Sequence, residues 1–146
     1  MQTAELARLG RKLKEAGMRI EVETNGTLAP SSELASLIDQ WNVSPKLANS
    51  GNPAEHREVP APLRWFAGQP DAYFKFVVVA PNDLEEVVAL VDRYGVPPER
   101  VVLMPEGTTA AVLEARSRWL VERCVALGYR FSPRLHILLW GDERGR

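Results

Sequence analysis

Helical and strand-like segments alternate along this chain, and this alternation constrains its fold more than any other feature. Leu6, Leu9 and Leu13 share one helical face within residues 3–16, and the next segment, 18–24, reads as a strand. Repeated units of this kind predict an α/β fold with parallel strands and right-handed crossovers. Further strands are expected at 41–44, 73–79 and 101–104, and further helices at 31–38, 62–67, 82–95 and 108–127.

Polar residues indicate where several of these helices begin. Ser31 or Ser32 can cap the helix that runs to about residue 38. Asn82 is followed by Glu85, which has the spacing of a reciprocal N-terminal capping pattern. Thr108 can cap the long helix that follows the fourth strand.

Three segments carry further expectations. The strand at 73–79 is nearly all apolar, which predicts burial on both of its faces. Residues 47–57 are polar and irregular, and loops of this length inside a compact domain are often functional. The tail, residues 129–140, is expected to hold two short strands around Pro133.

Size and composition limit the classes of protein to consider. The 146 residues fit one domain, 1–146, and the net charge of −1 does not indicate a nucleic-acid-binding surface. No apolar run is long enough to cross a bilayer, and the first residues lack the pattern of a secretory signal. Cys124 is the single cysteine, and its apolar helical surroundings predict a buried core residue. We therefore expect a cytoplasmic protein without nucleic-acid or membrane partners.

Polar residues also follow the expected strands, at the ends where parallel α/β sheets bind ligands. Glu23 and Asn25 lie at the junction of the first strand with the loop that follows it, although an Asn-Gly pair alone favours a simple turn. Pro45 can end the second strand and leave Lys46 solvated. A ligand role is equally well supported, because Lys46 could neutralise a carboxylate and Ser44 could hydrogen-bond a sugar hydroxyl.

Other residues have both a functional and a structural interpretation. The segment Met104-Pro105-Glu106-Gly107 leads into the long helix, whose first N–H groups can either meet a polar ligand or be capped in the ordinary way. His136 lies in an apolar expected strand, where a lone histidine is more often a core residue than a catalyst. Lys75 lies in an otherwise apolar strand and needs a partner or a ligand there.

No phosphate-binding loop, dinucleotide fingerprint, HExxH pair or GxSxG elbow is present in the sequence. Several short segments, each weak alone, instead form an ordered set that covers nearly the whole chain. In this order and spacing they resemble the 7-carboxy-7-deazaguanine synthases, radical S-adenosylmethionine enzymes of queuosine and deazapurine biosynthesis. The segments are 22–27, 41–46 with 50–52, 74–77, 103–107 and 135–141.

This resemblance implies a partial TIM-like barrel of parallel strands, of the radical S-adenosylmethionine type. In such enzymes a [4Fe–4S] cluster reduces S-adenosyl-L-methionine to a 5′-deoxyadenosyl radical, which removes hydrogen from 6-carboxy-5,6,7,8-tetrahydropterin. A ring contraction assisted by Mg²⁺, with loss of ammonia, then gives 7-carboxy-7-deazaguanine.

The resemblance also implies roles for individual residues. His136 is expected to contact the pterin substrate, and Glu23 and Asn25 are expected on the side of the cofactor. The expected contacts of S-adenosylmethionine are Ser44, Pro45, Lys46, Met104, Pro105, Glu106 and Gly107.

The sequence lacks several features of that family. The three closely spaced cysteines that hold the cluster, the magnesium-binding threonine that follows them and the N-terminal substrate contacts have no counterpart here. The Gly-Glu-Pro segment that usually precedes the first helix, expected here at 3–16, is also absent. The resemblance therefore implies a C-terminal portion of the enzyme, inactive alone, that comes from a split gene, a truncated reading frame or an incomplete assembly. A split gene would provide the N-terminal segment as a separately encoded partner, and the resemblance is also compatible with a homodimer. The alternatives are a non-catalytic remnant that binds an adenosine ligand without a cluster, or a fragment whose exposed sheet edge prevents stable folding.

Overall fold

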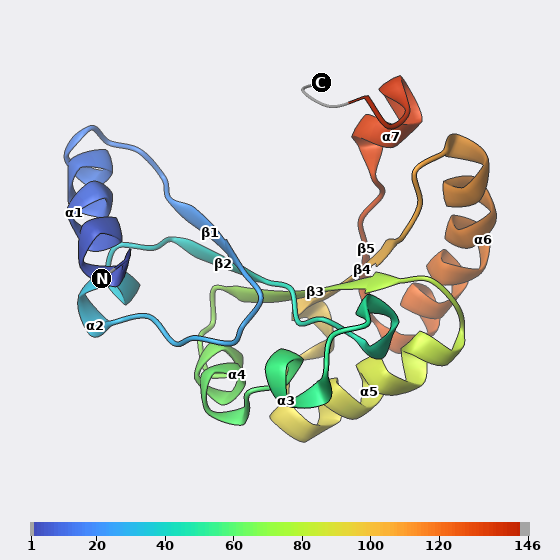
Figure 1. The fold of residues 1–146 in the computed structure, drawn as a ribbon, viewed down its shortest axis with the longest axis horizontal. Helices are drawn as coiled ribbons and strands as arrows, with labels where there is room; N and C mark the ends of the chain where they lie inside the picture. Colours follow the sequence, from blue (N-terminus) through green and yellow to red (C-terminus); the bar gives the residue numbers. More distant parts are fainter. Residues whose placement is uncertain (1, 144–146) are drawn as a thin grey trace.

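A sheet of five parallel strands, in the order β1-β2-β3-β4-β5, forms the centre of the molecule (Figure 1). The computed structural model describes residues 2–143. The predicted α/β class and parallel sheet are confirmed. Within the described residues β1 and β5 are the two edges of the sheet, and closure into a barrel stays a prediction. The strands are β1 (Glu21–Thr24), β2 (Gln40–Val43), β3 (Ala72–Val78), β4 (Val101–Pro105) and β5 (Arg130–Phe131).

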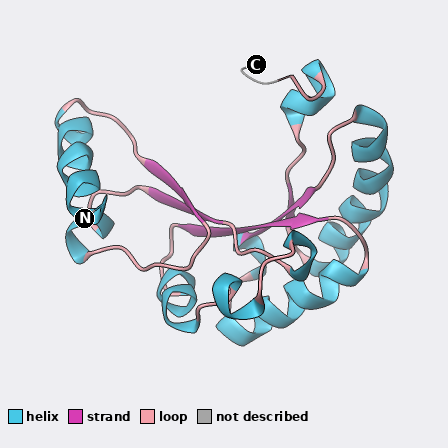
Figure 2. Cartoon of the chain, viewed as in Figure 1, coloured by secondary structure: helices cyan, strands magenta, loops and turns pink. Residues whose placement is uncertain are grey.

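Helices connect the strands, and Figures 1 and 2 show α4, α5 and α6 along one side of the sheet. The longer helices match the expected ones closely, because each has a strong apolar stripe or a clear end signal. The helices are α1 (Gln2–Glu15), α2 (Ser32–Ala35), α3 (Ala54–Arg57), α4 (Pro60–Ala67), α5 (Asn82–Tyr94), α6 (Ala110–Leu127) and α7 (Leu135–Trp140), with short 3₁₀ turns η1 (Ala48–Ser50) and η2 (Pro98–Arg100).

The two faces of the sheet differ in burial. On β3, Phe74 and Phe76 are buried in the core, whereas Lys75 and Val77 on the opposite face are only half-buried. The prediction that 73–79 is buried on both faces is therefore wrong, since the helices cover one face only. We call the other face the inner face, and it carries Glu23, Asn42, Tyr73, Lys75, Val77, Val102, Met104 and Arg130.

An aromatic cluster on the covered face fixes α4 against β2. The ring centroids of Trp41 and Phe66 lie 5.4 Å apart, and those of Trp65 and Phe66 lie 4.9 Å apart, both in edge-to-face geometry. Such pairs add to the gain from burying the rings. The cluster holds the strand that leads to Ser44, at the carboxyl end of the sheet.

The helix starts differ in part from those predicted. Ser31 is the residue that caps α2, accepting a hydrogen bond from the Leu34 N–H at 3.2 Å. The prediction that Asn82 caps α5 is wrong, because Asn82 is the first residue of the helix. The side chain of Asp83, and not that of Asn82, accepts hydrogen bonds from the turn before the helix. One Asp83 carboxylate oxygen accepts from the N–H groups of Val79 at 2.7 Å and Ala80 at 3.0 Å.

Two further expectations are wrong. Thr109, not Thr108, caps α6, since its hydroxyl accepts from the Val112 N–H at 3.3 Å. The second expected strand of the tail is the helix α7, so His136 lies on an exposed helical turn rather than in an apolar strand. The run 135–140 is apolar almost throughout, and a short run of this kind has no period that separates a strand from a helix.

The polar segment 47–57 is not wholly irregular, because it contains η1 and α3.

Within residues 2–143, no helix combines the length and the apolar character needed to cross a bilayer.

Candidate functional site

A hollow of about 330 Å³ lies on the inner face, at the carboxyl ends of the strands. Five of the residues expected to bind the cofactor come together around it, from three different strand ends. Their binding role stays a prediction, whereas their proximity follows from the parallel sheet. The hollow is lined by Glu23, Thr24, Asn25, Ser44, Lys46, Lys75, Val77 and Met104.

A second hollow of about 390 Å³ adjoins the first, and Lys46 and Val77 line both. It includes two more expected residues, Pro45 and Glu106. Its lining mixes apolar surface with side-chain amides and a hydroxyl, a combination that suits a planar heterocycle with polar edges. The remaining lining residues are Leu47, Asn49, Ser50, Asn52 and Val79.

The loop after β2 is held in place by backbone and side-chain contacts. The Ser44 N–H donates to the Thr24 carbonyl at 2.7 Å, which extends the pairing of the strands. Arg57 donates to the Lys46 carbonyl at 3.3 Å and forms an ion pair with Glu86. Glu86 also accepts from the Ala48 N–H at 2.8 Å. These contacts fix the backbone of Lys46, while its side chain is exposed and available to a ligand.

Asn49 connects this loop to the end of β3. Its amide nitrogen donates to the Val77 carbonyl at 3.1 Å and to the Asp83 carboxylate at 2.9 Å. The same carboxylate oxygen of Asp83 accepts from the backbone after β3. The loop and the strand end therefore form a wall of the second hollow, and Asp83 at the start of α5 holds them in place.

The segment after β4 is fixed by two arginines. Arg116 donates to the Glu106 carbonyl at 2.5 Å and pairs with the Glu106 carboxylate, and Arg134 donates to the Gly107 carbonyl at 2.8 Å. Pro105 and Gly107 are buried, and neither lines the two hollows. A Cβ atom on Gly107 would lie 2.9 Å from Leu113 Cδ2, so close packing requires glycine there.

The turn after β1 confirms the structural interpretation of Asn25. Its side-chain oxygen accepts from the Thr27 N–H at 3.1 Å and from the Thr27 hydroxyl at 2.8 Å. Glu23 instead points to the inner face, where its carboxylate lies 3.3 Å from the Lys75 ammonium. Lys75 thus has the partner that its place in the strand required.

Sequence reasoning missed some residues that line the two hollows, and the contact of His136 with the pterin stays a prediction. Thr24 lies between Glu23 and Asn25, two of the predicted site residues. Asn49 lies in the polar segment 47–57, in which the sequence indicates no individual binding residue. Lys75 was noted as unusual without being placed in the site. His136 lies on α7 and lines neither hollow, so the geometry does not bring it to the cofactor residues.

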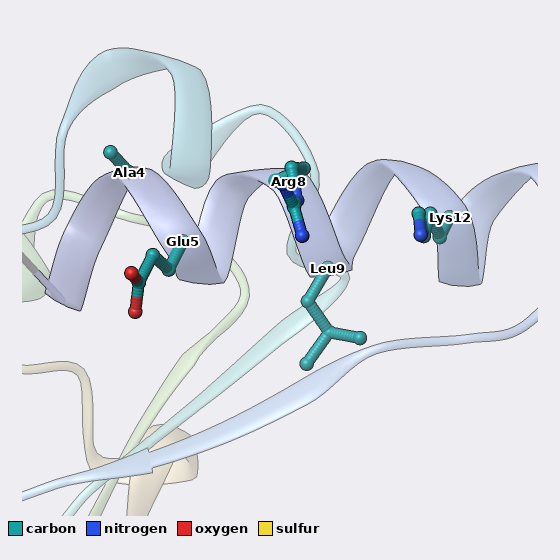
Figure 3. A pocket seen from close by; sticks show the side chains of 5 residues that line it. All are labelled: Ala4, Glu5, Arg8, Leu9 and Lys12. Carbon is teal, nitrogen blue, oxygen red and sulfur yellow. The ribbon is translucent and has the colours of Figure 1, made fainter.

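A larger hollow, of about 470 Å³, lies on α1 (Figure 3). Its lining comes from that helix alone, and Figure 3 shows Glu5 and Leu9 projecting from the lower side of the helix. Because one helix alone lines this hollow, it does not bring together polar side chains from several elements. We therefore place the candidate site at the strand ends, where several elements meet.

The described residues do not provide the ligands of a cluster. Cys124 is buried in the core, as predicted, and burial raises the pKa of its thiol to about 11, so it is a poor thiolate ligand. Within residues 2–143, no group of three or more His, Cys, Asp or Glu residues is placed to hold a metal ion. The residues present therefore do not fit a [4Fe–4S] cluster, which cysteine thiolates hold.

The curated relatives that match this chain share one name. No protein-family model matches the chain. A 7-carboxy-7-deazaguanine synthase of Pyrobaculum aerophilum is 41% identical over 87% of this chain and 54% of the relative. Synthases of the same name from Halobacterium salinarum and Rhodopirellula baltica are 38% and 28% identical, over 90% and 92% of this chain.

The match extends along nearly the whole of this chain but over only part of each relative. The chain spans 54%, 58% and 55% of the length of these three relatives, which is little more than half. Over the portion that it spans, the chain is related in sequence to the 7-carboxy-7-deazaguanine synthase family.

Proposed function

We propose that this chain is the C-terminal portion of a radical S-adenosylmethionine 7-carboxy-7-deazaguanine synthase and forms the cofactor-binding side of its site. The complete enzyme would convert 6-carboxy-5,6,7,8-tetrahydropterin to 7-carboxy-7-deazaguanine with loss of ammonia. The observation that supports this best is the meeting of Glu23, Ser44, Lys46 and Met104 around one hollow, because these residues lie in the segments that resemble the family. The parallel sheet is compatible with a partial TIM-like barrel.

The residues of the two hollows fit the chemistry of S-adenosylmethionine. The Lys46 ammonium can pair with the methionine carboxylate, and the Ser44 hydroxyl can hydrogen-bond a ribose hydroxyl. The second hollow, with its apolar walls and the Asn52 amide, can enclose the adenine. When bound, S-adenosylmethionine would supply the hydrogen-abstracting group, and the residues of this chain would bind and orient it.

The cluster and the magnesium ion are expected to depend on residues outside this chain. We therefore expect that the chain alone, reconstituted with iron and sulfide, shows neither cluster absorbance nor cleavage of S-adenosylmethionine. Adding the separately expressed N-terminal segment of the Pyrobaculum aerophilum relative should restore the conversion of the pterin. A chain that binds the cofactor but gains no activity with that segment would favour the alternative, a non-catalytic adenosine-binding remnant.

Binding of the cofactor is tested directly with S-adenosylhomocysteine, a stable analogue, by calorimetry. Lys46→Ala should weaken this binding by about 1.5–3 kcal/mol, the range for hydrogen bonds to charged groups. Lys12→Ala, which changes an exposed lysine on α1, is the matched control and should leave the affinity unchanged. Unchanged affinity in Lys46→Ala would return Lys46 to a solvated surface role.

A further inference from the structure

Lys75 occupies an enclosed position for a lysine. It lies on β3, the central strand, in register with Val102 of β4, so its side chain rises from the middle of the inner face. The side chain is 27% exposed. Lysine is rarely enclosed to this degree without a partner, because removing its charge from water is costly.

The partner that Lys75 has is a weak one. The Glu23 carboxylate lies 3.3 Å away on the edge strand β1, and the Glu23 side chain is 76% exposed. An ion pair with one member in water contributes about 0–1 kcal/mol. Lys75 can therefore exchange the Glu23 carboxylate for the carboxylate of a ligand at little cost in free energy.

Lys75 is also reachable from two sides. With Glu23 it lines both the 330 Å³ hollow and a neighbouring hollow of about 310 Å³ toward the amino ends of the strands. In that neighbouring hollow the Arg130 guanidinium stacks on the Tyr73 ring, 4.9 Å from its centroid. Lys46 lines the first of these hollows but not the second, and Arg130 lines the second but not the first.

The proposed reaction brings together two molecules that each carry a carboxylate, and the 330 Å³ hollow offers two lysines. Lys46, at the end of β2, is assigned to the carboxylate of S-adenosylmethionine. We propose that Lys75 is a further binding residue, whose ammonium group exchanges Glu23 for the carboxylate of the pterin substrate. This inference rests on the proposed function, because that function supplies the second ligand.

The test uses the full chain and two fluorescent probes, 6-carboxypterin and unsubstituted pterin, titrated in the presence of S-adenosylhomocysteine. The two probes differ only in the carboxylate. We expect the chain to bind 6-carboxypterin about tenfold more tightly than pterin, as a charge-assisted hydrogen bond would provide. Lys75→Met, which keeps an unbranched side chain but removes the ammonium group, should remove this preference, and Lys75→Arg should keep most of it.

Two control variants test whether the preference for 6-carboxypterin depends on Lys75 and not on a neighbouring cation. Arg130→Met should leave the preference for 6-carboxypterin unchanged. Lys46→Met should weaken binding of S-adenosylhomocysteine and leave the preference measured with the two pterins intact. Thermal unfolding of Lys75→Met, compared with that of the unchanged chain, verifies that the variant is folded.

The proposal is overturned if Lys75→Met keeps the preference, if the unchanged chain shows none, or if Arg130→Met removes it. Failure of the proposed function would be seen separately, as the absence of S-adenosylhomocysteine binding in a chain that still prefers the carboxylated pterin.

Discussion

At the scale of single residues, Gly26 occupies a position that only glycine fits well. It follows β1 with φ of +77°, in the left-handed region, and a Cβ atom there would lie 2.9 Å from both Leu63 Cδ2 and Val43 Cγ1. Gly26→Ala therefore adds backbone strain to overpacking, and we expect it to lower the free energy of unfolding by about 2–4 kcal/mol. Urea unfolding followed by circular dichroism measures this change.

Gly51 provides the control for that prediction. Its φ of +72° is similar, but a Cβ atom there would meet nothing within 4 Å. Gly51→Ala should therefore carry only the backbone cost, about 1–2 kcal/mol. Equal losses in the two variants would show that the contacts with Leu63 and Val43 contribute nothing.

Residue-scale features were predictable from the sequence where the interaction is local. The turn at Asn25 followed from an Asn-Gly pair, and its side-chain hydrogen bonds to Thr27 lie within two residues of it. Lys75 could be noted as unusual, but its partner Glu23 lies 52 residues away in the sequence. Glu23 on β1 and Lys75 on β3 are separated by β2, so their contact depends on the order of the strands in the sheet, which local sequence patterns do not reveal.

At the scale of elements, one carboxylate joins α1 to the strands. Asp39 accepts from the Lys14 ammonium at 2.6 Å and from the Ile20 N–H at 2.7 Å. The hydrogen bond from Lys14, followed by that from the Ile20 N–H, lowers the pKa of Asp39 below its ordinary value, although desolvation opposes this. A carboxyl whose pKa is lower in the folded state stabilises the fold above its unfolded pKa, and this stabilisation is lost as the pH falls through the folded pKa.

Asp39→Asn should therefore destabilise the protein at pH 7, and the difference from the unchanged chain should shrink as the pH falls below about 4. Urea unfolding midpoints of both proteins between pH 7 and pH 2.5 measure this. A difference that is the same at every pH would mean that the ionised carboxylate makes no contribution and that only the geometry of the side chain matters.

The helices as a whole were easier to predict from the sequence than the residues that cap them. The strong apolar stripes of α1 and α5 fixed those helices to within a residue or two. The choice between Asn82 and Asp83 depended on which side chain turns back to the preceding loop, and both residues favour such a role. The run at α7 lacks a period, so the strand assigned to His136 had no physical signal against a helix.

At the scale of the whole molecule, the parallel sheet explains why the candidate site could be predicted in outline. Strand ends that lie far apart in the sequence meet at one edge of such a sheet, so Ser44, Lys46 and Met104 come together without any motif linking them. The half-buried inner face could not be predicted, because an apolar strand such as β3 does not reveal which of its faces the helices cover. The neighbouring hollow with Arg130 depends on that face and was missed for the same reason.

The sheet should also differ in stability from its centre to its edge. β3 pairs on both sides and contributes Phe74, Phe76 and Val78 to the core, whereas β1 pairs only with β2 among the described strands and is half-exposed along its length. Amides of β3 should therefore exchange with solvent only when the whole fold opens, and those of β1 through local opening, at least about tenfold faster. Native-state hydrogen exchange followed by NMR measures both sets in one experiment. Equal protection of the two strands would show that β1 is as stable as the centre of the sheet. Little protection in any strand would mean that the chain does not fold stably alone. That outcome is expected if the edge of the sheet needs a further strand to cover it.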